Sequence, residues 1–405
     1  MADALSGVVV GPEIHRTVIG PIVVAPAAFK GAVSAAEAAR AITAGVQLAA
    51  TGVEVRVVPV ADGGEGTLDA LVAARHGRRR ATTVSDPRGR LIEAPIGELP
   101  GHTCVVELAQ ASGYERLAAH ERDPEQTSTY GTGQQLRMAL DLGAERLIIG
   151  LGGSATNDGA MGLARALGIR FLDAGGQELA GFGADLGRVD RIDLSGRDPR
   201  LEGIEILVAC DVSNPLCGPE GAARVFGPQK GADAAAVARL DAGLAQYATA
   251  VQRATGVDIA TIPGAGAAGG AAGGILALLG GMLTPGAALV LGAAGLEDRL
   301  EGAELCITGE GRLDAQSMSG KAVSAVAQAA QAADVPCVAV CGSLDLLPGM
   351  VRRMGLAAAF PINRHLASEP DALAATEVNL AATGAAIAGL WACAHGVRAR
   401  GEHDR

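Results

Sequence analysis

Aromatic and charged side chains are scarce in this chain. Nine of its 405 residues are Phe, Tyr or Trp and 19% are charged, whereas 49% are hydrophobic and 58 residues are glycine. This is the composition of a globular protein, and the length suggests two or three domains with sizeable cores. Positive charge is in deficit as well, with a net charge of −11 and a pI of about 5.2. These values argue against nucleic acid or an anionic membrane as a partner, although a local basic pocket for a small anion is compatible with them.

Metal-binding and disulfide patterns are also missing. None of the seven cysteines forms a C-x-x-C pair, and the seven histidines are scattered. We therefore expect reduced thiols in a cytoplasmic protein and no zinc site. Residues 1–19 lack a basic region followed by an apolar one, so they do not resemble a signal peptide, and we expect a flexible extension there.

One long segment carries no charge at all, from Pro263 to Leu296. Its strongly apolar pieces are far shorter than the ~20 residues that a membrane span needs. We expect it to form buried core and loop.

Short apolar runs alternate with glycine-rich polar loops and helical patterns along most of the chain. Helices are expected from about Ser34 to Ala50, where Ser34 and Glu37 fit a capping box, and after Gly66 to about Arg75. The expected strands cover residues 22–25, 55–60, 103–108, 146–149, 204–209, 305–308, 336–340 and 357–361. Repeated β-loop-α units of this kind predict an α/β fold with mostly parallel sheets.

The composition changes near Arg80 and near Pro285, and the first two expected strands have the character of the last three. This pattern predicts a discontinuous domain of residues 20–80 plus 287–395, with a second α/β domain, 81–286, inserted in it. We interpret the basic run 78–80 as a solvated helix end.

Three glycine-rich loops resemble nucleotide fingerprints by their letters. Residues 264–269 fit G-x-G-x-x-G but do not follow a strand, which makes the signal weak. Residues 150–155 fit G-x-G-x-x-A, follow an expected strand and open an expected helix, and Asp173 lies downstream, so a dinucleotide remains an alternative ligand. The third loop ends in Gly320-Lys321 but has Ala315 where a P-loop has its first glycine, so it is not a Walker A sequence.

The densest polar segment is residues 308–321, between an apolar stretch and an alanine-rich helical pattern. Its 14 residues include two acids, an arginine, a lysine, three hydroxyls and three glycines. Open α/β sheets place ligand sites in such loops after strands. Phosphoryl transfer needs cations around the moving group and carboxylates for Mg²⁺. The loops of this chain supply both kinds, with Lys30, Lys230, Arg312 and Lys321 as cations and Asp62, Glu65, Asp158, Asp211 and Asp314 as carboxylates.

Nine motifs in register, over roughly residues 20 to 390, closely resemble those of bacterial type I glycerate kinases. They are residues 25–31, 62–67, 109–113, 129–133, 152–159, 211–218, 226–231, 263–270 and 308–321. One of them departs from the family pattern, because Ala27 and Ala28 replace the usual Asp-Ser pair beside Lys30. If the lost groups contact substrate, affinity or choice of substrate would differ from that of relatives.

The resemblance implies a two-domain protein in which a Rossmann- or flavodoxin-like domain is built from both chain ends and the active site lies in the cleft. It implies ATP, Mg²⁺ and D-glycerate as small-molecule ligands, with 2-phospho-D-glycerate as the product. The position of the phosphorylated hydroxyl and the oligomeric state stay open, with 3-phosphoglycerate, a related hydroxy acid and a homodimer among the alternatives. A protein that only binds glycerate or nucleotide is a further alternative.

Within this frame, we expect Arg312, Asp314 and Lys30 to carry catalysis. Arg312 would neutralise the glycerate carboxylate or the developing phosphate charge, and Asp314 would orient the attacking hydroxyl. Substrate or phosphate binding is expected from Ser154, Asn157, Asp158, Asn214 and Lys321, and magnesium binding from Asp62, Glu65 and Asp211. These residues also have structural alternatives. Asp62 and Glu65 could cap the following helix, and Ser154, Asn157 and Asp158 could form an N-cap and turn. Asp211 and Asn214 could form a turn before Pro215.

Overall fold

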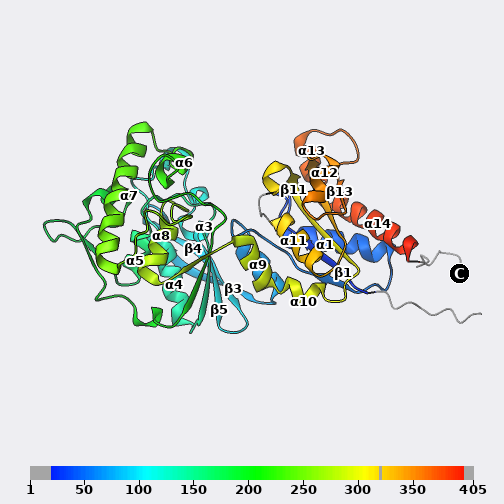
Figure 1. The fold of residues 1–405 in the computed structure, drawn as a ribbon, viewed down its shortest axis with the longest axis horizontal. Helices are drawn as coiled ribbons and strands as arrows, with labels where there is room; N and C mark the ends of the chain where they lie inside the picture. The colour runs from blue at the N-terminus through cyan, green and yellow to red at the C-terminus, as the bar shows by residue number, and fades with distance from the viewer. Residues whose placement is uncertain (1–19, 319–321, 396–405) are drawn as a thin grey trace, which may run out of the picture.

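The computed structural model describes residues 20–318 and 322–395, and two sheets organise them into two lobes (Figure 1). The five-stranded sheet has the order β13-β12-β11-β1-β2, and every neighbouring pair in it is parallel. Its strands are β1 (Ile22–Pro26), β2 (Val55–Val57), β11 (Leu305–Leu313), β12 (Cys337–Leu344) and β13 (Ala358–Pro361). In chain order along the sheet this is 2-1-3-4-5, a doubly wound arrangement whose direction switches between β1 and β11.

The six-stranded sheet has the order β10-β9-β6-β5-β4-β3. Its strands are β3 (Arg78–Ser85), β4 (Leu91–Leu99), β5 (Thr103–Glu107), β6 (Arg146–Gly150), β9 (Glu205–Ala209) and β10 (Met282–Thr284). The pairs from β10 to β5 are parallel, whereas β3, β4 and β5 form an antiparallel meander. A separate antiparallel pair joins β7 (Arg170–Leu172) and β8 (Arg191–Asp193).

Helices cover both faces of the five-stranded sheet. The side chains of Ile22 and Val24 pack with α1 and α14, and those of Val23 and Ala25 face the opposite core, towards α9 to α12. The helices are α1 (Ala35–Ala49), α2 (Thr67–Ala74), α3 (Leu108–Ser112), α4 (Tyr130–Asp141), α5 (Met161–Ala166), α6 (Ala222–Phe226), α7 (Ala234–Thr255), α8 (Ala271–Gly274), α9 (Gly286–Ala294), α10 (Leu296–Leu300), α11 (Ala322–Ala332), α12 (Pro348–Arg353), α13 (Glu369–Ala374) and α14 (Thr376–Ala394).

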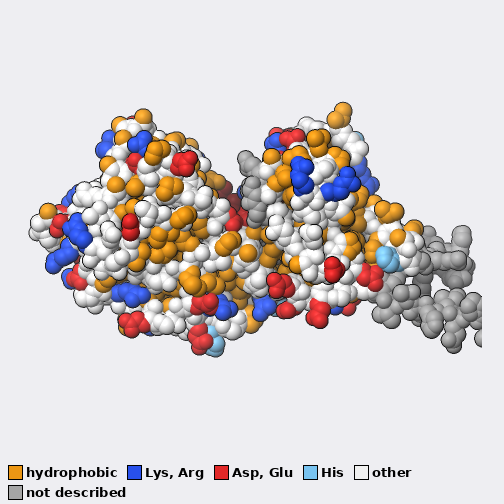
Figure 2. Space-filling model, in the orientation of Figure 1, with side chains coloured by type: hydrophobic (Ala, Val, Ile, Leu, Met, Phe, Trp, Pro, Cys, Tyr) orange, Lys and Arg blue, Asp and Glu red, His pale blue; other side chains and the backbone are white. Residues whose placement is uncertain are grey.

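The core of the five-stranded sheet continues into the other lobe. Val105 of β5 and Ile148 of β6 belong to the same buried cluster as Val23, with α2 and α9 between the two sheets. Figure 2 shows a hollow on the opposite side of this junction, with acidic side chains on its wall. The two lobes therefore share apolar packing at one end and diverge at the other.

The predicted α/β class and the predominance of parallel pairing are confirmed. The expected capping box also forms, because the Ser34 side chain accepts from the Glu37 N–H and the Glu37 carboxylate accepts from the Ser34 N–H. Burial of all residues of β1 and β5 explains why these strands read as continuous apolar runs.

The interpretation of residues 78–80 as a helix end is wrong. Arg78 begins β3, and Arg78 and Arg80 both form ion pairs with Glu98 on the antiparallel neighbour β4. Side chains two apart on a strand share a face, so both guanidinium groups reach one carboxylate.

The polar segment after residue 308 is also less of a loop than expected. Strand β11 continues to Leu313, because β12 is long enough to pair with Arg312 and Leu313 through Ser343 and Leu344. This pairing places Arg312 inside a regular strand, one residue before its end, rather than in an extended loop.

The uncharged segment 263–296 forms α8, the π-helical turn Ile275–Leu279, β10 and α9, and its apolar side chains Ile275, Leu278 and Leu279 are buried, as expected. Within the described residues one helix, Thr376–Ala394, is long and apolar enough to cross a membrane by length and composition alone. It packs along α1 through Leu380 and Ile387, as a core helix does.

Candidate active site

A large cavity opens where the direction of the five-stranded sheet switches. Its volume is about 680 Å³, and the loops that follow β1 and β11 form much of its wall. Carboxyl ends of parallel strands at such a switch are the usual ligand site of open α/β sheets. The predicted residues Lys30, Glu65, Arg312 and Asp314 all line this cavity, and so do Ala27 and Ala28.

Arg312 and Asp314 contact each other at the edge of the large cavity. The Arg312 Nε lies 3.3 Å from the Asp314 Oδ2, and the Arg312 Nη2 lies 3.7 Å from the Asp345 Oδ2. Ser317 fixes the turn that follows, because its hydroxyl accepts from the Asp314 N–H at 3.2 Å and donates to the Arg312 carbonyl at 3.4 Å. The Arg312 side chain is 66% exposed, so it remains accessible to an anionic ligand.

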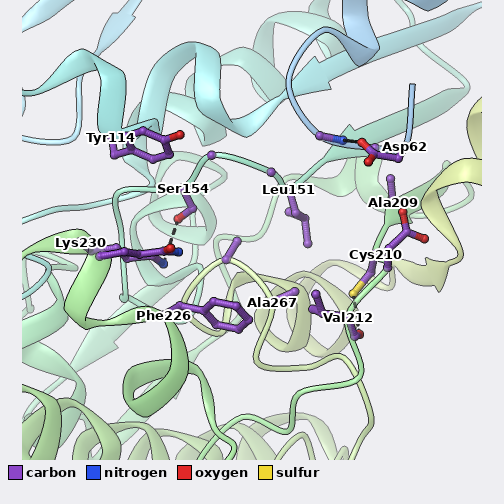
Figure 3. Close-up of a pocket in the computed structure, with 17 residues that line it drawn as sticks. Asp62, Tyr114, Leu151, Ser154, Ala209, Cys210, Val212, Phe226, Lys230 and Ala267 are labelled. Carbon is purple, nitrogen blue, oxygen red and sulfur yellow. Dashed lines mark hydrogen bonds between the residues drawn. The ribbon is translucent and has the colours of Figure 1, made fainter. Parts of the chain in front are cut away.

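A smaller cavity of about 260 Å³ lies at the carboxyl ends of the parallel strands of the other sheet. Figure 3 shows Tyr114, Ser154 and Lys230 on one side of it, and Asp62 and Cys210 on the opposite side. Asp211 also lines the small cavity, and so do the apolar residues Leu151, Val212, Phe226 and Ala267.

Among the described residues, Lys230 is the only basic one that lines the small cavity. It is 3% exposed, and its Nζ donates to the Thr156 carbonyl at 2.6 Å and to the Ser154 Oγ at 3.5 Å. Burial lowers the pKa of the Lys230 ammonium to about 7, and the charge of Asp158 opposes this shift only in part.

Asn157 and Asp158 lie behind Ser154 and are fully buried. The Asp158 Oδ2 accepts from the N–H and hydroxyl of Thr129, at 2.7 and 2.8 Å, and from the Gly162 N–H at 3.2 Å. Burial raises the pKa of the Asp158 carboxyl against these hydrogen bonds. Neither residue is on the wall of the small cavity, and the carboxylate joins the start of α4 to the start of α5, so its observed contacts match the structural alternative. Substrate contact by these two residues stays a prediction.

Asp62 is the residue that the two cavities share. It lies in the loop before α2, where its Oδ1 accepts from the Gly64 N–H at 3.2 Å. This loop presses against the loop after β6, since a Cβ added to Gly152 would lie 2.6 Å from the Gly64 Cα. Only glycine permits such an approach, which explains why both loops are rich in glycine and why residues 150–155 resemble a nucleotide fingerprint in the sequence.

The cap of α2 is not supplied by Asp62 or Glu65. Glu107, from the end of β5, accepts from the Gly66 N–H at 3.1 Å and from the Leu68 N–H at 3.3 Å. Burial raises the pKa of the Glu107 carboxyl to about 7 although these bonds favour its ionised form. The capping alternative for Asp62 and Glu65 is therefore wrong, and both residues line a cavity.

The predicted magnesium ligands divide between the two cavities. Asp62 and Asp211 line the small one, whereas Glu65 lines only the large one. The Asp211 Oδ1 accepts from the Gly286 N–H at 2.7 Å, and a Cβ at Gly286 would lie 2.8 Å from the Asp211 Oδ2 and 2.3 Å from the Asp62 carbonyl oxygen. No group of three or more His, Cys, Asp or Glu side chains in residues 20–318 and 322–395 could hold a metal ion by itself. Two carboxylates fit Mg²⁺ when substrate phosphates and water complete the ligand set.

Among the described residues, three predicted ones lie on neither cavity wall, namely Asn157, Asp158 and Asn214. The Asn214 Nδ2 donates to the Glu220 carbonyl at 2.8 Å, which supports its turn role, and Lys321 lies outside the described residues. The dinucleotide alternative needs Asp173 as the acid that binds the ligand. The Asp173 Oδ1 instead accepts from the N–H groups of Gly175 and Gln177 within its own turn. In addition, the loop after β6 does not open a helix directly, since α5 starts only at Met161.

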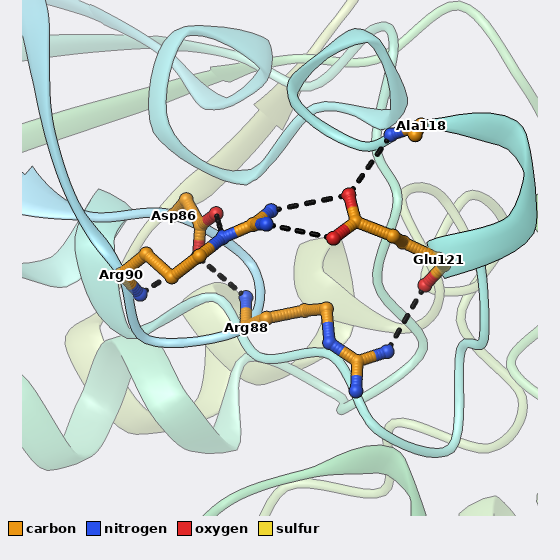
Figure 4. Close-up of polar contacts among 5 residues, drawn as sticks. All are labelled: Asp86, Arg88, Arg90, Ala118 and Glu121. Atoms are coloured by element: carbon orange, nitrogen blue, oxygen red, sulfur yellow. Dashed lines mark hydrogen bonds and ion pairs between the residues drawn. The ribbon is translucent and has the colours of Figure 1, made fainter.

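An ion-pair network fixes the segment that carries Tyr114 (Figure 4). The Arg90 guanidinium pairs with Glu121 at 2.7 Å and with Asp86 at 2.5 Å, and the Ala118 N–H donates to Glu121 at 3.0 Å. Hydrogen bonds from Arg90 lower the pKa of the Glu121 carboxyl. The turn between β3 and β4 is thereby joined to residues 118–121, a few residues after Tyr114, which lines the small cavity.

The sequence interpretation missed Tyr114, Cys210, Phe226 and Glu107. Tyr114 directly follows the motif 109–113, Phe226 opens the motif 226–231, and Cys210 precedes the predicted Asp211, so the recognised motifs could have suggested all three. No sequence signal marks Glu107, which reaches α2 from a strand about 40 residues later.

The sequence profile of the Glycerate kinase family matches residues 22–392. The chain is 44% identical over 354 residues to the glycerate kinase of Halalkalibacterium halodurans, covering 87% of this chain and 93% of that one. It is also 44% identical to the glycerate 2-kinase of Escherichia coli, over 84% of this chain and 90% of the relative. A crystal structure under the name glycerate kinase 2, from Salmonella typhimurium LT2, superimposes with a TM-score of 0.86 at 40% identity, covering 93% of this chain and 100% of that one.

Proposed function

This chain belongs to the glycerate kinase family, and we propose that it is an ATP-dependent kinase that phosphorylates D-glycerate to 2-phospho-D-glycerate. The observation that supports this most directly is the pair of cavities that meet at Asp62. A kinase has to hold two polar substrates side by side, with positive charge around the transferred group. Arg312 and Lys30 provide that charge on the large cavity and Lys230 on the small one.

We propose direct in-line transfer near Asp62. The glycerate hydroxyl oxygen forms the new bond to the γ-phosphorus while the bond to the ADP oxygen breaks, and the hydroxyl proton passes to a carboxylate or to water. Arg312 and Lys30 would bind the negative charge of the phosphates. Asp314 would position Arg312 through their ion pair at 3.3 Å, or would orient the hydroxyl itself, as the sequence predicts.

Asp62 and Asp211 are the proposed magnesium ligands, with Glu65 as a third candidate from the large cavity. A bound Mg²⁺ would neutralise phosphate charge. Ser154 would contact a substrate from the wall of the small cavity. Asn157, Asp158 and Asn214 remain proposed contacts although they lie on neither wall, and Lys321, which is outside the described residues, remains a proposed contact as well.

The division into two domains, 20–80 plus 287–395 and 81–286, belongs to this proposal. The five-stranded sheet takes its strands from residues 22–57 and 305–361, which supports the discontinuous arrangement. We also propose a cytoplasmic location, supported by seven cysteines that all lie in the described residues and form no disulfide.

The test is a coupled assay. The protein is incubated with ATP, Mg²⁺ and D-glycerate, together with enolase and no phosphoglycerate mutase. Immediate formation of phosphoenolpyruvate is the result expected for 2-phosphoglycerate. A signal that needs added mutase would mean the 3-isomer, and a lack of ADP release would contradict kinase activity altogether.

The non-catalytic alternative is supported by one specific observation. Ala27 and Ala28, which replace an acid and a hydroxyl of the family pattern, both line the large cavity beside Lys30. Glycerate or nucleotide binding without ADP release would favour this alternative.

A further inference from the structure

Lysine is used very sparingly in this chain. Of its 33 basic residues, 30 are arginine, and the three lysines are Lys30, Lys230 and Lys321. Arginine stays charged in proteins and has a wide planar head, whereas the compact ammonium of lysine loses its proton when it is desolvated. A lysine at the buried position 230 therefore needs a reason that is specific to the ammonium group.

The contacts of Lys230 hold its ammonium group at the wall of the small cavity. Its Nζ donates to the Thr156 carbonyl at 2.6 Å and lies 3.5 Å from the Ser154 Oγ, while the side chain lines the small cavity (Figure 3). An ammonium group has three donors, and these contacts use two of them. The Ser154 hydroxyl already lies 3.3 Å from the Thr156 carbonyl oxygen and 3.1 Å from the Thr156 hydroxyl, so the third ammonium donor is the one left for an anionic oxygen.

We propose that the small cavity is the acceptor site and that Lys230 binds the carboxylate of the hydroxy acid there. This inference rests on the proposed kinase function and assigns its two substrates to separate cavities. The volume of about 260 Å³ is small for a nucleotide and sufficient for a three-carbon acid, whereas the large cavity, about 680 Å³, is in the usual range for ligands of nucleotide size. The large cavity also lies at the switch point where doubly wound sheets bind nucleotides.

The protonation of Lys230 would then be coupled to binding. Because burial lowers the pKa of its ammonium to about 7, the free enzyme holds much of this group neutral at pH 8, and a bound carboxylate favours the charged form. Acceptor binding above pH 7 would therefore take up a proton, and the KM for the acid would rise with pH. The other titratable groups nearby are Asp62, Tyr114, Cys210 and Asp211 on the cavity wall and Asp158 and Tyr247 behind Lys230.

The decisive experiment compares Lys230→Met with the same substitution at Lys30. We expect K230M to raise the KM for D-glycerate by about 100-fold or more, with the KM for ATP changed less than about threefold, because a buried charge partner is lost. Lys30→Met should give the reverse pattern, with the main effects on kcat and on the KM for ATP. Circular dichroism and thermal unfolding verify that both variants are folded.

A binding measurement on the unmodified protein covers the case in which K230M does not fold. Calorimetric titration with D-glycerate at pH 8, in buffers of different ionisation enthalpy, should record uptake of close to one proton, falling to about one tenth at pH 6. A folded K230M should take up none.

Two results would overturn the inference. A raised KM for ATP with an unchanged KM for glycerate would assign Lys230 to the nucleotide phosphates, and unchanged values for both substrates would leave it a structural role. Failure of the proposed function is separate, since it would appear as a lack of ADP release by the wild type, before any variant is compared.

Discussion

From the contact between Arg312 and Asp314 we predict how much rate and how much stability is lost when either charge is removed. The two charged groups lie 3.3 Å apart, but the arginine side chain is 66% exposed. An exposed pair of this kind stabilises a fold by less than about 1 kcal/mol, so Arg312→Ala and Asp314→Asn should both remain folded. Loss of a charge that binds the transferred phosphoryl group typically costs on the order of 10³-fold in rate, or about 4 kcal/mol. Each variant should therefore lose far more in kcat/KM than in stability.

The double variant separates the two roles that Asp314 could have. If Asp314 acts through the guanidinium, Arg312→Ala removes its target, and the double variant should be about as slow as the slower single one, with a coupling energy near 4 kcal/mol. If Asp314 meets the glycerate hydroxyl directly, the losses should add to about 10⁶-fold. The assay is ADP release at saturating Mg²⁺ with both substrates varied.

Asp345 offers a matched control for this cycle. Its Oδ2 lies 3.7 Å from the Arg312 Nη2, and its side chain is 74% exposed. Asp345→Asn should change kcat/KM by less than about threefold, since a weak exposed contact positions little. Near wild-type turnover in both Arg312→Ala and Asp314→Asn would refute the assignment of the large cavity to catalysis.

The other predictions concern stability and metal use. Because the folded pKa of Glu107 is raised to about 7 from an ordinary 4.5, the stability of the wild type should fall by up to about 3 kcal/mol as the pH rises through this window, and Glu107→Gln should abolish the loss in urea unfolding. Gly152→Ala should lower the free energy of unfolding by about 1–3 kcal/mol, because the new Cβ would lie 2.6 Å from the Gly64 Cα. Gly292→Ala is the control, since a Cβ there has nothing within 4 Å, and thermal unfolding should show no loss of stability. EDTA should abolish turnover, and Asp211→Asn should raise the Mg²⁺ concentration for half-maximal rate by about tenfold or more; an unchanged Mg²⁺ requirement would remove Asp211 from the metal site.

Fully buried strands such as β1 and β5 were predictable, whereas partly exposed strands were predictable only in part, since β2 and β13 were expected and β3 was not. In β1 and β5 every residue is buried, so apolar runs located them within one residue. In β3 buried and exposed positions alternate only in the second half, and three arginines open the strand, which made its start read as a helix end. The end of β11 was missed because Gly309 and Gly311 interrupt its apolar run, while the partner strand β12 that fixes its length lies about 30 residues away.

For the site, the sequence could identify loops but not the direction of each side chain. Lys30 follows β1, Arg312 lies at the end of β11 and Asp314 directly follows it, and because these strands are neighbours in a parallel sheet, all three residues line one cavity. Asn157 and Asp158 are equally polar in the sequence, yet they are buried, because Thr129 from a different segment supplies the hydrogen bonds of the carboxylate. Such a partner lies 29 residues away, and local spacing carries no information about it.

The assignment of substrates to cavities connects the catalytic prediction with the inference on Lys230. If the acceptor carboxylate is held at Lys230, its hydroxyls extend towards Asp62, where the large cavity begins. Asp314 belongs to the large cavity and would meet the hydroxyl only if the two lobes approach each other around the shared packing of α2 and α9. Suppose that the Arg312 and Asp314 substitutions are strongly coupled and that Lys230→Met affects only the KM for glycerate. Asp314 would then act on the nucleotide, in the large cavity. Additive losses with the same Lys230 result would require closure of the lobes during turnover, because one carboxylate would then have to reach a substrate bound in the other cavity.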